Sequence, residues 1–277
     1  MRLVTYRSDR GDRAGVLRDE RVLDAWDALG GEGHTVRELL EAGRVGDLEG
    51  AEGEGAALGA VELLPPVPDP DKIVCIGLNY RAHAAEAGMD PPETPTLFGK
   101  YRNALAPPGA TVELPAASRK VDFEAEVAFV VGRRAAAVGE PEALDHVAGY
   151  MLLNDLSARD LQFATPQWMP GKVFDGSAPC GPALVTTDDA GPADAIEFAL
   201  DLNGERMQAS DTGDLVFSIP ALVAHLSRLM TLEPGDIVAT GTPSGVGSTR
   251  DPRVWLAPGD EVVISSPQLG ELRPLIG

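Results

Sequence analysis

The 277-residue chain has few cysteines and little positive charge, and each shortage excludes a class of protein. Its two cysteines, Cys75 and Cys180, cannot build a disulfide framework, and no Cys-x-x-Cys pattern is present for zinc or redox chemistry. We therefore expect a reducing compartment. Only 23 basic residues oppose 43 acidic ones, which argues against binding to the phosphate backbone of a nucleic acid.

Long apolar runs are also missing. No window approaches the roughly 18 uncharged apolar residues of a membrane span, and Met1 to Arg13 lacks the apolar stretch of a signal peptide. The sequence therefore predicts a cytoplasmic protein that does not bind a membrane. Apolar residues still make up 44% of the chain, which is enough for a substantial core.

A proline-rich run divides the chain into two parts. Proline fixes φ and donates no backbone hydrogen bond, so Leu64-Pro-Pro-Val-Pro-Asp-Pro-Asp71 predicts a stiff linker. We predict a small N-terminal α/β domain over residues 1–66 and a larger domain over residues 67–277. In the small domain, Thr35-Val-Arg-Glu38 has the capping-box pattern of a helix start.

The larger part contains many short apolar runs separated by glycine and proline, such as Glu126 to Val131 and Val147 to Asn154. Helical periodicity is clear only in Pro141 to His146 and in Ser218 to Met230, where the serine can act as the N-cap. Strands outnumber helices and do not alternate regularly with them. We therefore predict a β-rich α+β fold with a mixed or antiparallel roll.

Two acidic segments carry the strongest chemical signal. In Asp122-Phe-Glu-Ala-Glu126, which leads into an apolar strand, alternation places the three carboxylates on one face. Such carboxylates repel one another and are costly to desolvate unless a cation lies between them. Asp155 follows a second apolar strand, and alone it is equally consistent with a helix N-cap. Together, Glu124, Glu126 and Asp155 would offer the hard oxygen ligands that Mg²⁺ or Mn²⁺ prefers.

A histidine and a glutamate form a second candidate site. His83 and Glu86 are three residues apart in Gly77-Leu-Asn-Tyr-Arg-Ala-His-Ala-Ala-Glu-Ala-Gly88, so they are neighbours if this segment is helical. A carboxylate beside an imidazole orients the ring and raises its basicity, as in a general base that takes a proton from water. An isolated pair of this kind is more often a surface ion pair.

The basic residues near these segments are Lys100, Arg159 and Lys172. In so acidic a chain they could assemble a local site for an anionic substrate. Each taken singly is more typical of a solvated surface cation.

Six motifs in register resemble the fumarylacetoacetate hydrolase family over about residues 70–265. They are Gly77-Leu-Asn-Tyr-x-x-His-x-x-Glu86, Asp122-Phe-Glu-Ala-Glu126, Asn154-Asp-x-Ser-Ala-Arg-Asp-x-Gln162, Gly171-Lys-x-Phe-Asp175, Gly181-Pro, and Thr231-Leu-Glu-Pro-Gly-Asp-x-x-Ala-Thr-Gly-Thr-Pro-Ser-Gly-Val-Gly247. The resemblance implies a catalytic domain built as a mixed β-sandwich roll, usually a homodimer. The N-terminal residues resemble the small domain of bacterial members, such as acylpyruvases and 2-hydroxyhepta-2,4-diene-1,7-dioate isomerases.

The resemblance also implies roles for individual residues. Mg²⁺ or Mn²⁺ would be held by Glu124, Glu126 and Asp155. His83 and Glu86 would form the catalytic dyad, and Lys172 would meet the developing oxyanion of the substrate. The substrate pocket would be lined by Arg159, Gln162 and Thr242, and we add Lys100 to the substrate-binding residues. The loop between Gln162 and Lys172 departs from the family pattern at Met169-Pro170, so specificity does not carry over if this loop touches the substrate.

We predict a divalent-metal-dependent hydrolase that cleaves a carbon–carbon bond in an acylpyruvate or similar 1,3-dicarbonyl acid through a metal-chelated enolate. The His-Glu dyad would activate the attacking water. The same site suits decarboxylation of oxaloacetate, or isomerisation or dehydration of a 2-oxo-dienoate, and an oriented base for water favours hydrolysis among these. A metal-stabilised binding protein is the alternative without catalysis.

Overall fold

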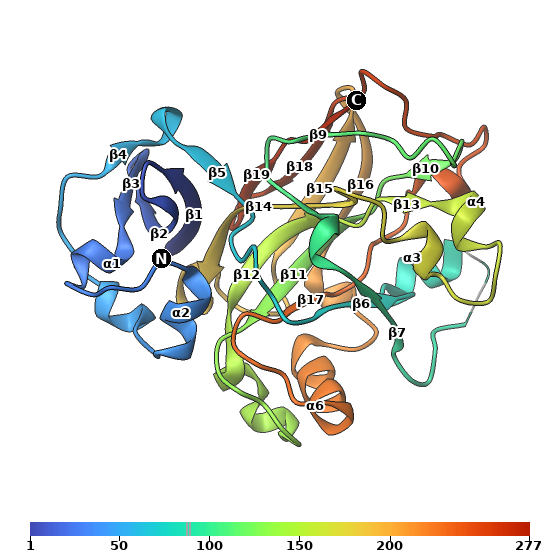
Figure 1. Ribbon diagram of the computed structural model, residues 1–277. Helices are drawn as coiled ribbons and strands as arrows, with labels where there is room; N and C mark the ends of the chain where they lie inside the picture. Colours follow the sequence, from blue (N-terminus) through green and yellow to red (C-terminus); the bar gives the residue numbers. More distant parts are fainter. Residues whose placement is uncertain (87, 89) are drawn as a thin grey trace.

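The computed structural model describes residues 1–86, 88 and 90–277, and its largest feature is a mixed 12-stranded sheet (Figure 1). The strands along its main path follow the order β4-β3-β2-β1-β14-β12-β11-β17-β6-β7. Those from the larger part of the chain are β6 (Ile73–Gly77), β7 (Thr96–Lys100), β11 (Ala125–Val131), β12 (Val147–Asn154), β14 (Ala178–Thr186) and β17 (Ile237–Ala239). The pair β17–β6 is parallel, whereas β11 pairs antiparallel with both β12 and β17.

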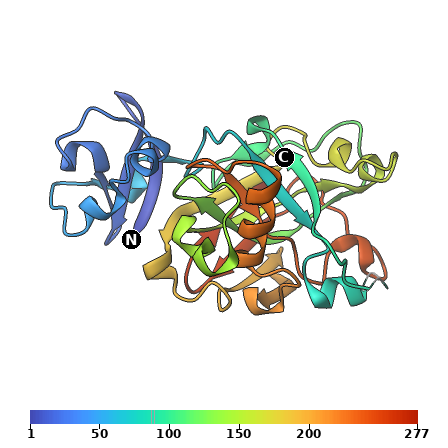
Figure 2. The ribbon, with the colours of Figure 1, turned by 90° about the horizontal axis from the view of Figure 1, so that it is seen from below.

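The N-terminal strands extend this sheet at one end of the molecule, as Figures 1 and 2 show. Strand β1 pairs antiparallel with β14 through Arg2 and Leu3. The elements of this part are β1 (Arg2–Ser8), β2 (Gly11–Arg18), β3 (Arg21–Asp24), α1 (Ala25–Ala28), α2 (Val36–Glu41), β4 (Ala56–Ala57) and β5 (Glu62–Leu64). Thr35 and Glu38 form the predicted capping box of α2. The division into domains after residue 66 stays a prediction.

Strand β11 is buried on both faces, and alternation decides which core each side chain joins. Val127 and Phe129 belong to one hydrophobic cluster, whereas Ala128 and Val130 belong to another on the opposite face. The predicted alternation is confirmed. The acidic segment is not one continuous strand, however, because β10 (Val121–Asp122) ends before Phe123 and β11 begins after Glu124.

A second, four-stranded antiparallel sheet supplies the other side of the first cluster. Its order is β16-β15-β18-β19, with bounds β15 (Glu197–Leu202), β16 (Glu205–Asp211), β18 (Val262–Ser266) and β19 (Gly270–Leu272). Phe198, Leu200 and Ile264 of this sheet share that cluster with Val127 and Phe129. The two layers confirm the predicted β-rich α+β fold with a mixed β-sandwich roll.

Short elements complete the chain. The helix α6 (Ile219–Leu229) begins after Ser218, whose hydroxyl accepts from the amide of Ala221 as predicted. The segment predicted as a helix from Pro141 is a 3₁₀ helix, η4 (Glu140–His146). The others are α3 (Arg81–Glu86), α4 (Arg159–Gln162), α5 (Thr187–Ala190), β8 (Leu105–Ala106), β9 (Thr111–Val112), β13 (Ser157–Ala158), β20 (Leu275–Ile276), η1 (Val45–Leu48), η2 (Leu58–Ala60), η3 (Arg102–Ala104), η5 (Met169–Gly171), η6 (Thr212–Asp214) and η7 (Gly247–Thr249). No described helix is both long and apolar enough to span a membrane.

Candidate active site

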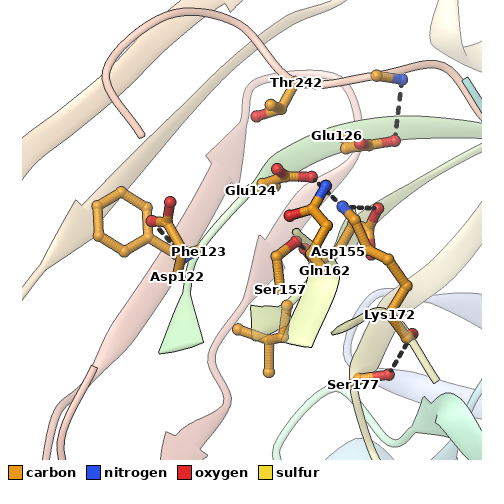
Figure 3. Close-up of polar contacts among 12 residues, drawn as sticks. Asp122, Phe123, Glu124, Glu126, Asp155, Ser157, Gln162, Lys172, Ser177 and Thr242 are labelled. Atoms are coloured by element: carbon orange, nitrogen blue, oxygen red, sulfur yellow. Dashed lines mark hydrogen bonds and ion pairs between the residues drawn. The ribbon is translucent and has the colours of Figure 1, made fainter. Parts of the chain in front are cut away.

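Three carboxylates converge at one point, where β11 begins and its neighbour β12 ends (Figure 3). In the antiparallel pair β11–β12, Ala125 lies opposite Asn154, so the start of one strand meets the end of the other. The amide of Asp155 donates to the carbonyl oxygen of Glu124 at 2.9 Å. One carboxylate oxygen from each of Glu124, Glu126 and Asp155 lies within 4.8 Å of the others, and all three residues are buried.

The charges around this triad leave one carboxylate without a counter-ion. Lys100, Arg159 and Lys172 make ion pairs with Glu124, Asp155 or the nearby Asp122. Glu126 has no ion-pair partner among the described residues. Its Oε2 accepts a 2.9 Å hydrogen bond from the amide of Gly241. Burial, together with the charges of Asp155 and Glu124, raises the pKa of Glu126 well above its usual range.

These carboxylates suit a divalent cation. Asp155 Oδ1 lies 2.8 Å from Lys100 Nζ, but the direction is wrong for a hydrogen bond, so this buried oxygen has no hydrogen-bond partner among the described residues. Buried oxygens that lack partners, together with uncompensated negative charge, fit a cation ligated by hard donors. An all-oxygen set is the one preferred by Mg²⁺ or Mn²⁺ rather than by zinc.

Lys172 lies beside the triad, and its role toward the oxyanion of the substrate stays a prediction. Its ammonium lies 2.7 Å from both Glu124 Oε2 and Asp155 Oδ2. It also lies 4.8 Å from the ring centroid of Phe98. Burial alone lowers the pKa of a lysine, but the charges of Asp155 and Glu124 outweigh it and raise the pKa of Lys172. The two carboxylates therefore favour the charged form of the side chain.

Lys100 lies behind Asp155 rather than beside the cavity described below. Its side chain is 0% exposed, and its Nζ donates to the carbonyl and hydroxyl oxygens of Ser177 at 3.0 and 2.9 Å and also to the carbonyl oxygen of Lys172. Lys100 is absent from the described residues that line the cavity. This position supports Asp155 and does not offer the direct substrate contact that the sequence predicted.

We expect Lys100→Met to lower the free energy of unfolding by about 3–5 kcal/mol, because it breaks a buried ion pair and leaves the surrounding oxygens without a donor. Urea unfolding in the presence of a chelator measures the change. The matched control is Lys120→Met, at an exposed position. Equal stability of the two variants would show that the buried ammonium contributes no net stabilisation.

The guanidinium of Arg159 makes ion pairs with two carboxylates and a hydrogen bond to the side-chain amide of Gln162. Its Nε lies 2.8 Å from Asp122 Oδ2, and its terminal nitrogens lie 2.7 Å from Glu124 Oε1 and 2.9 Å from Gln162 Oε1. Burial opposes the charge of Arg159, but Glu124 and Asp122 outweigh it and raise its pKa. Gln162 and Arg159 both line the cavity, as predicted. Their role in binding substrate stays a prediction.

Asp122 has a role that the sequence did not reveal. It does not join the triad; instead its Oδ1 accepts from the amide of Gly247 at 2.7 Å, and its Oδ2 accepts from the amide of Ser248 at 3.0 Å. It therefore fixes the glycine-rich turn near Thr242 against Arg159. The two residues after Asp122 leave the strand, and this break in the pairing was not visible in the alternation.

His83 and Glu86 form the predicted pair in helix α3. The predicted helix between Asn79 and Gly88 covers Arg81 to Glu86 in the structure, and residue 87 lies outside the described residues. His83 Nδ1 lies 3.2 Å from Glu86 Oε2. Glu86 Oε1 accepts from the amide of Gly245 at 2.9 Å, so the same carboxylate holds the glycine-rich turn. Nδ1 of His83 is thus held by Glu86, and Nε2 has no hydrogen-bond partner among the residues that the structure describes.

Thr242 lines the cavity but its hydroxyl is already engaged. The hydroxyl donates to the carbonyl oxygen of Ala125 and accepts from Gln208 Nε2, both at 2.9 Å. Gln208 Oε1 accepts from the amide of Ala125, also at 2.9 Å. Gln208 was not foreseen, because it comes from the second sheet and no motif marks it. It braces the start of β11, which carries Glu126 and directly follows Glu124.

One cavity of about 340 Å³ brings most of these residues together. Its lining includes seven predicted residues, His83, Glu124, Glu126, Arg159, Gln162, Lys172 and Thr242. Its other walls are Ile76, Gly77, Leu78, Phe98, Phe163, Trp168, Ser248 and Thr249. A larger cavity of about 810 Å³ lies between the N-terminal part and β12 and β14, and none of the predicted site residues lines it. The candidate site residues therefore gather at the smaller cavity.

Residues 72–276 match the family described as fumarylacetoacetate (FAA) hydrolase C-terminal. The chain therefore belongs to the fumarylacetoacetate hydrolase family, and it is an enzyme, as the members of that family are.

The proteins similar to this chain carry names that refer to different activities. The mitochondrial oxaloacetate tautomerase fahd2 of Xenopus laevis is 41% identical over 214 residues, which are 76% of this chain and 67% of that protein. An HpcE protein from Mycobacterium smegmatis has a TM-score of 0.91 and 36% identity, over 100% of this chain and 99% of the other. A maleylpyruvate hydrolase from Sphingobium sp. SYK-6, solved with manganese (II) ion and pyruvate, has a TM-score of 0.83 and 31% identity, over 100% and 98%.

Proposed function

We propose that this enzyme acts on a small 2-oxo acid beside a divalent metal ion, Mg²⁺ or Mn²⁺, and that His83 transfers a proton in the reaction. One observation carries the proposal. Glu124 and Glu126 of the carboxylate triad line the same cavity as His83. Nδ1 of His83 is held by Glu86. The carboxylates of a cation site and an oriented base therefore line one cavity.

Glu124, Glu126 and Asp155 would hold the ion. When bound, the ion would supply a Lewis acid that polarises the 2-oxo group of the substrate. The manganese and pyruvate in the solved maleylpyruvate hydrolase support this assignment. The uncompensated charge of Glu126 supports it independently, because a divalent cation is what would make ionisation of that buried carboxylate favourable.

His83 would move the proton. A carboxylate only accepts hydrogen bonds, so Glu86 favours the tautomer in which Nδ1 of His83 carries the proton. Nε2 is then basic. The side chain of His83 is only 13% exposed, which keeps the base apart from bulk water. Lys172 would stabilise negative charge that develops on a substrate oxygen, since its ammonium is fixed in the cavity wall.

Keto–enol tautomerisation of oxaloacetate is the reaction that we propose first. It needs one base and one fixed cation near the substrate oxygen, and the chain supplies both. The 41% identity to oxaloacetate tautomerases supports this choice. Hydrolytic cleavage of an acylpyruvate is the second candidate, favoured by the Glu86-oriented base, which can equally activate water, and by the likeness to a maleylpyruvate hydrolase.

The test is to supply oxaloacetate, acetylpyruvate and fumarylpyruvate to the purified protein with Mg²⁺, with Mn²⁺ and with a chelator. Enol and keto forms are followed by ultraviolet absorbance, and pyruvate release reports cleavage or decarboxylation. We expect metal-dependent interconversion of oxaloacetate. Release of pyruvate from acetylpyruvate without that interconversion would favour hydrolysis, and no turnover of any of them with metal bound would overturn both. The homodimer and the cytoplasmic location stay predictions.

A further inference from the structure

We propose that Trp168 is a specificity-determining residue that lines the apolar part of the cavity and restricts the enzyme to compact 2-oxo acids. The inference rests on the proposed function, because it assumes that a 2-oxo acid binds at the carboxylate triad. It concerns the loop between Gln162 and Lys172, which is the segment that departs from the family pattern.

The cavity is lined by both polar and apolar residues. Gln162, Thr242, Ser248 and Thr249 give one part of the lining hydroxyl and amide groups. The apolar part is lined by Ile76, Leu78, Phe98, Phe163 and Trp168. A carboxylate or hydroxyl on the substrate can be satisfied only by the polar lining, so an alkyl or alkenyl substituent belongs against the apolar residues.

Trp168 packs against Gly77 and Phe98 among these apolar residues. A Cβ on Gly77 would lie 2.3 Å from Trp168 Cζ3 and 2.9 Å from Cη2, so the six-membered ring of the indole lies directly over the glycine. The indole also meets Phe98 edge to face, with ring centroids 5.8 Å apart and planes inclined by 65°. Gly77 thus leaves room for a large side chain that a β-carbon would displace.

The ring of Phe98 contacts both Trp168 and the ammonium of Lys172. The rings of Phe98 and Trp168 form a T-shaped pair. The ammonium nitrogen of Lys172 lies 4.8 Å from the centroid of the Phe98 ring. Trp168 and Lys172 also come from the same short loop, which is held by the hydrogen bond from the amide of Gly171 to the carbonyl oxygen of Trp168 at 3.0 Å. A substituent that extends from the reacting end toward the apolar residues therefore meets Phe98 and then the indole.

The experiment measures binding rather than turnover. Unbranched 2-oxo acids from pyruvate to 2-oxooctanoate are titrated by calorimetry into the Mn²⁺-loaded protein. We expect the affinity of the wild-type protein to drop once the tail reaches the indole. In Trp168→Ala, the affinity for the longer acids relative to pyruvate should rise at least about tenfold, since one methylene in an apolar pocket changes discrimination by about 10- to 200-fold.

Gly77→Ala gives the opposite change and an internal check. The new methyl group must push the indole toward the cavity, so the drop in affinity should move to shorter acids. In the double variant Gly77→Ala/Trp168→Ala the clash is absent, and binding should match that of Trp168→Ala alone. The control is Tyr101→Ala, which removes an exposed aromatic ring in contact with Met169 but outside the described cavity lining.

The outcomes separate the two proposals. If the wild-type protein binds none of the acids with Mn²⁺ present, the proposed function fails. If it binds pyruvate but the dependence on chain length is the same in Trp168→Ala and in Tyr101→Ala, the proposed function stands and the role of Trp168 is wrong. An effect of Gly77→Ala that persists unchanged in the double variant would also overturn it.

Discussion

Replacing Glu126 with glutamine should abolish metal binding and activity together while the protein stays folded. The amide keeps an oxygen that can accept from the amide of Gly241, but it removes the carboxylate that lacks an ion pair among the described residues. We expect Mn²⁺ to bind at least about 100-fold more weakly, as titration calorimetry would show, and turnover to fall below detection. In a chelator, the variant should be at least as stable as the wild type, because glutamine keeps an oxygen for the hydrogen bond from Gly241 and never has to carry a buried charge.

Glu142→Gln is the matched control, since Glu142 is exposed on η4. It should change neither metal affinity nor turnover. Full activity of Glu126→Gln would remove the ion at this site from the mechanism. Loss of activity with unchanged Mn²⁺ affinity would instead point to Glu126 acting on the substrate itself.

Replacing His83 with alanine should separate metal binding from catalysis. His83 lies outside the carboxylate triad, so Mn²⁺ affinity should stay within about twofold of the wild-type value. Turnover should fall by about 10²- to 10⁴-fold, the usual contribution of a general acid or base. Mn²⁺ titration and a turnover assay with the best substrate of the wild type measure the two effects.

His225→Ala controls for the loss of an imidazole, because His225 lies in α6 and outside the described cavity lining. Equal activity of His83→Ala and His225→Ala would reassign the pair in α3 to packing or to holding the turn at Gly245. The substrate also matters: decarboxylation of oxaloacetate should suffer less than tautomerisation, because no base has to remove a proton from carbon.

Local patterns in the sequence predicted several features correctly. Alternation predicted that Glu124, directly before β11, and Glu126, within it, would point to the same side, because successive side chains on an extended chain point to opposite sides. The spacing of His83 and Glu86 makes them neighbours on a helix for an equally local reason. The caps at Thr35 and Ser218 depend only on the next few backbone amides.

Features that depend on distant partners were not predictable in the same way. Lys100 was expected in the substrate pocket, but its sequence context gives no sign that Ser177 and Asp155 would surround its ammonium. Asp122 shares the alternation of the other acids, yet its carboxylate binds the backbone at Gly247. Gln208 reaches the site from a different sheet.

The sequence by itself determined the strand-rich character, the acidic segments, the spacing of His83 and Glu86, and the family, since each depends on neighbouring residues or on motifs in a fixed order. The tertiary structure alone decided that the N-terminal strands join the main sheet, that Lys100 lies behind Asp155, and that Trp168 rests on Gly77. The physical reason is that packing and charge pairing depend on which remote segments the fold brings together.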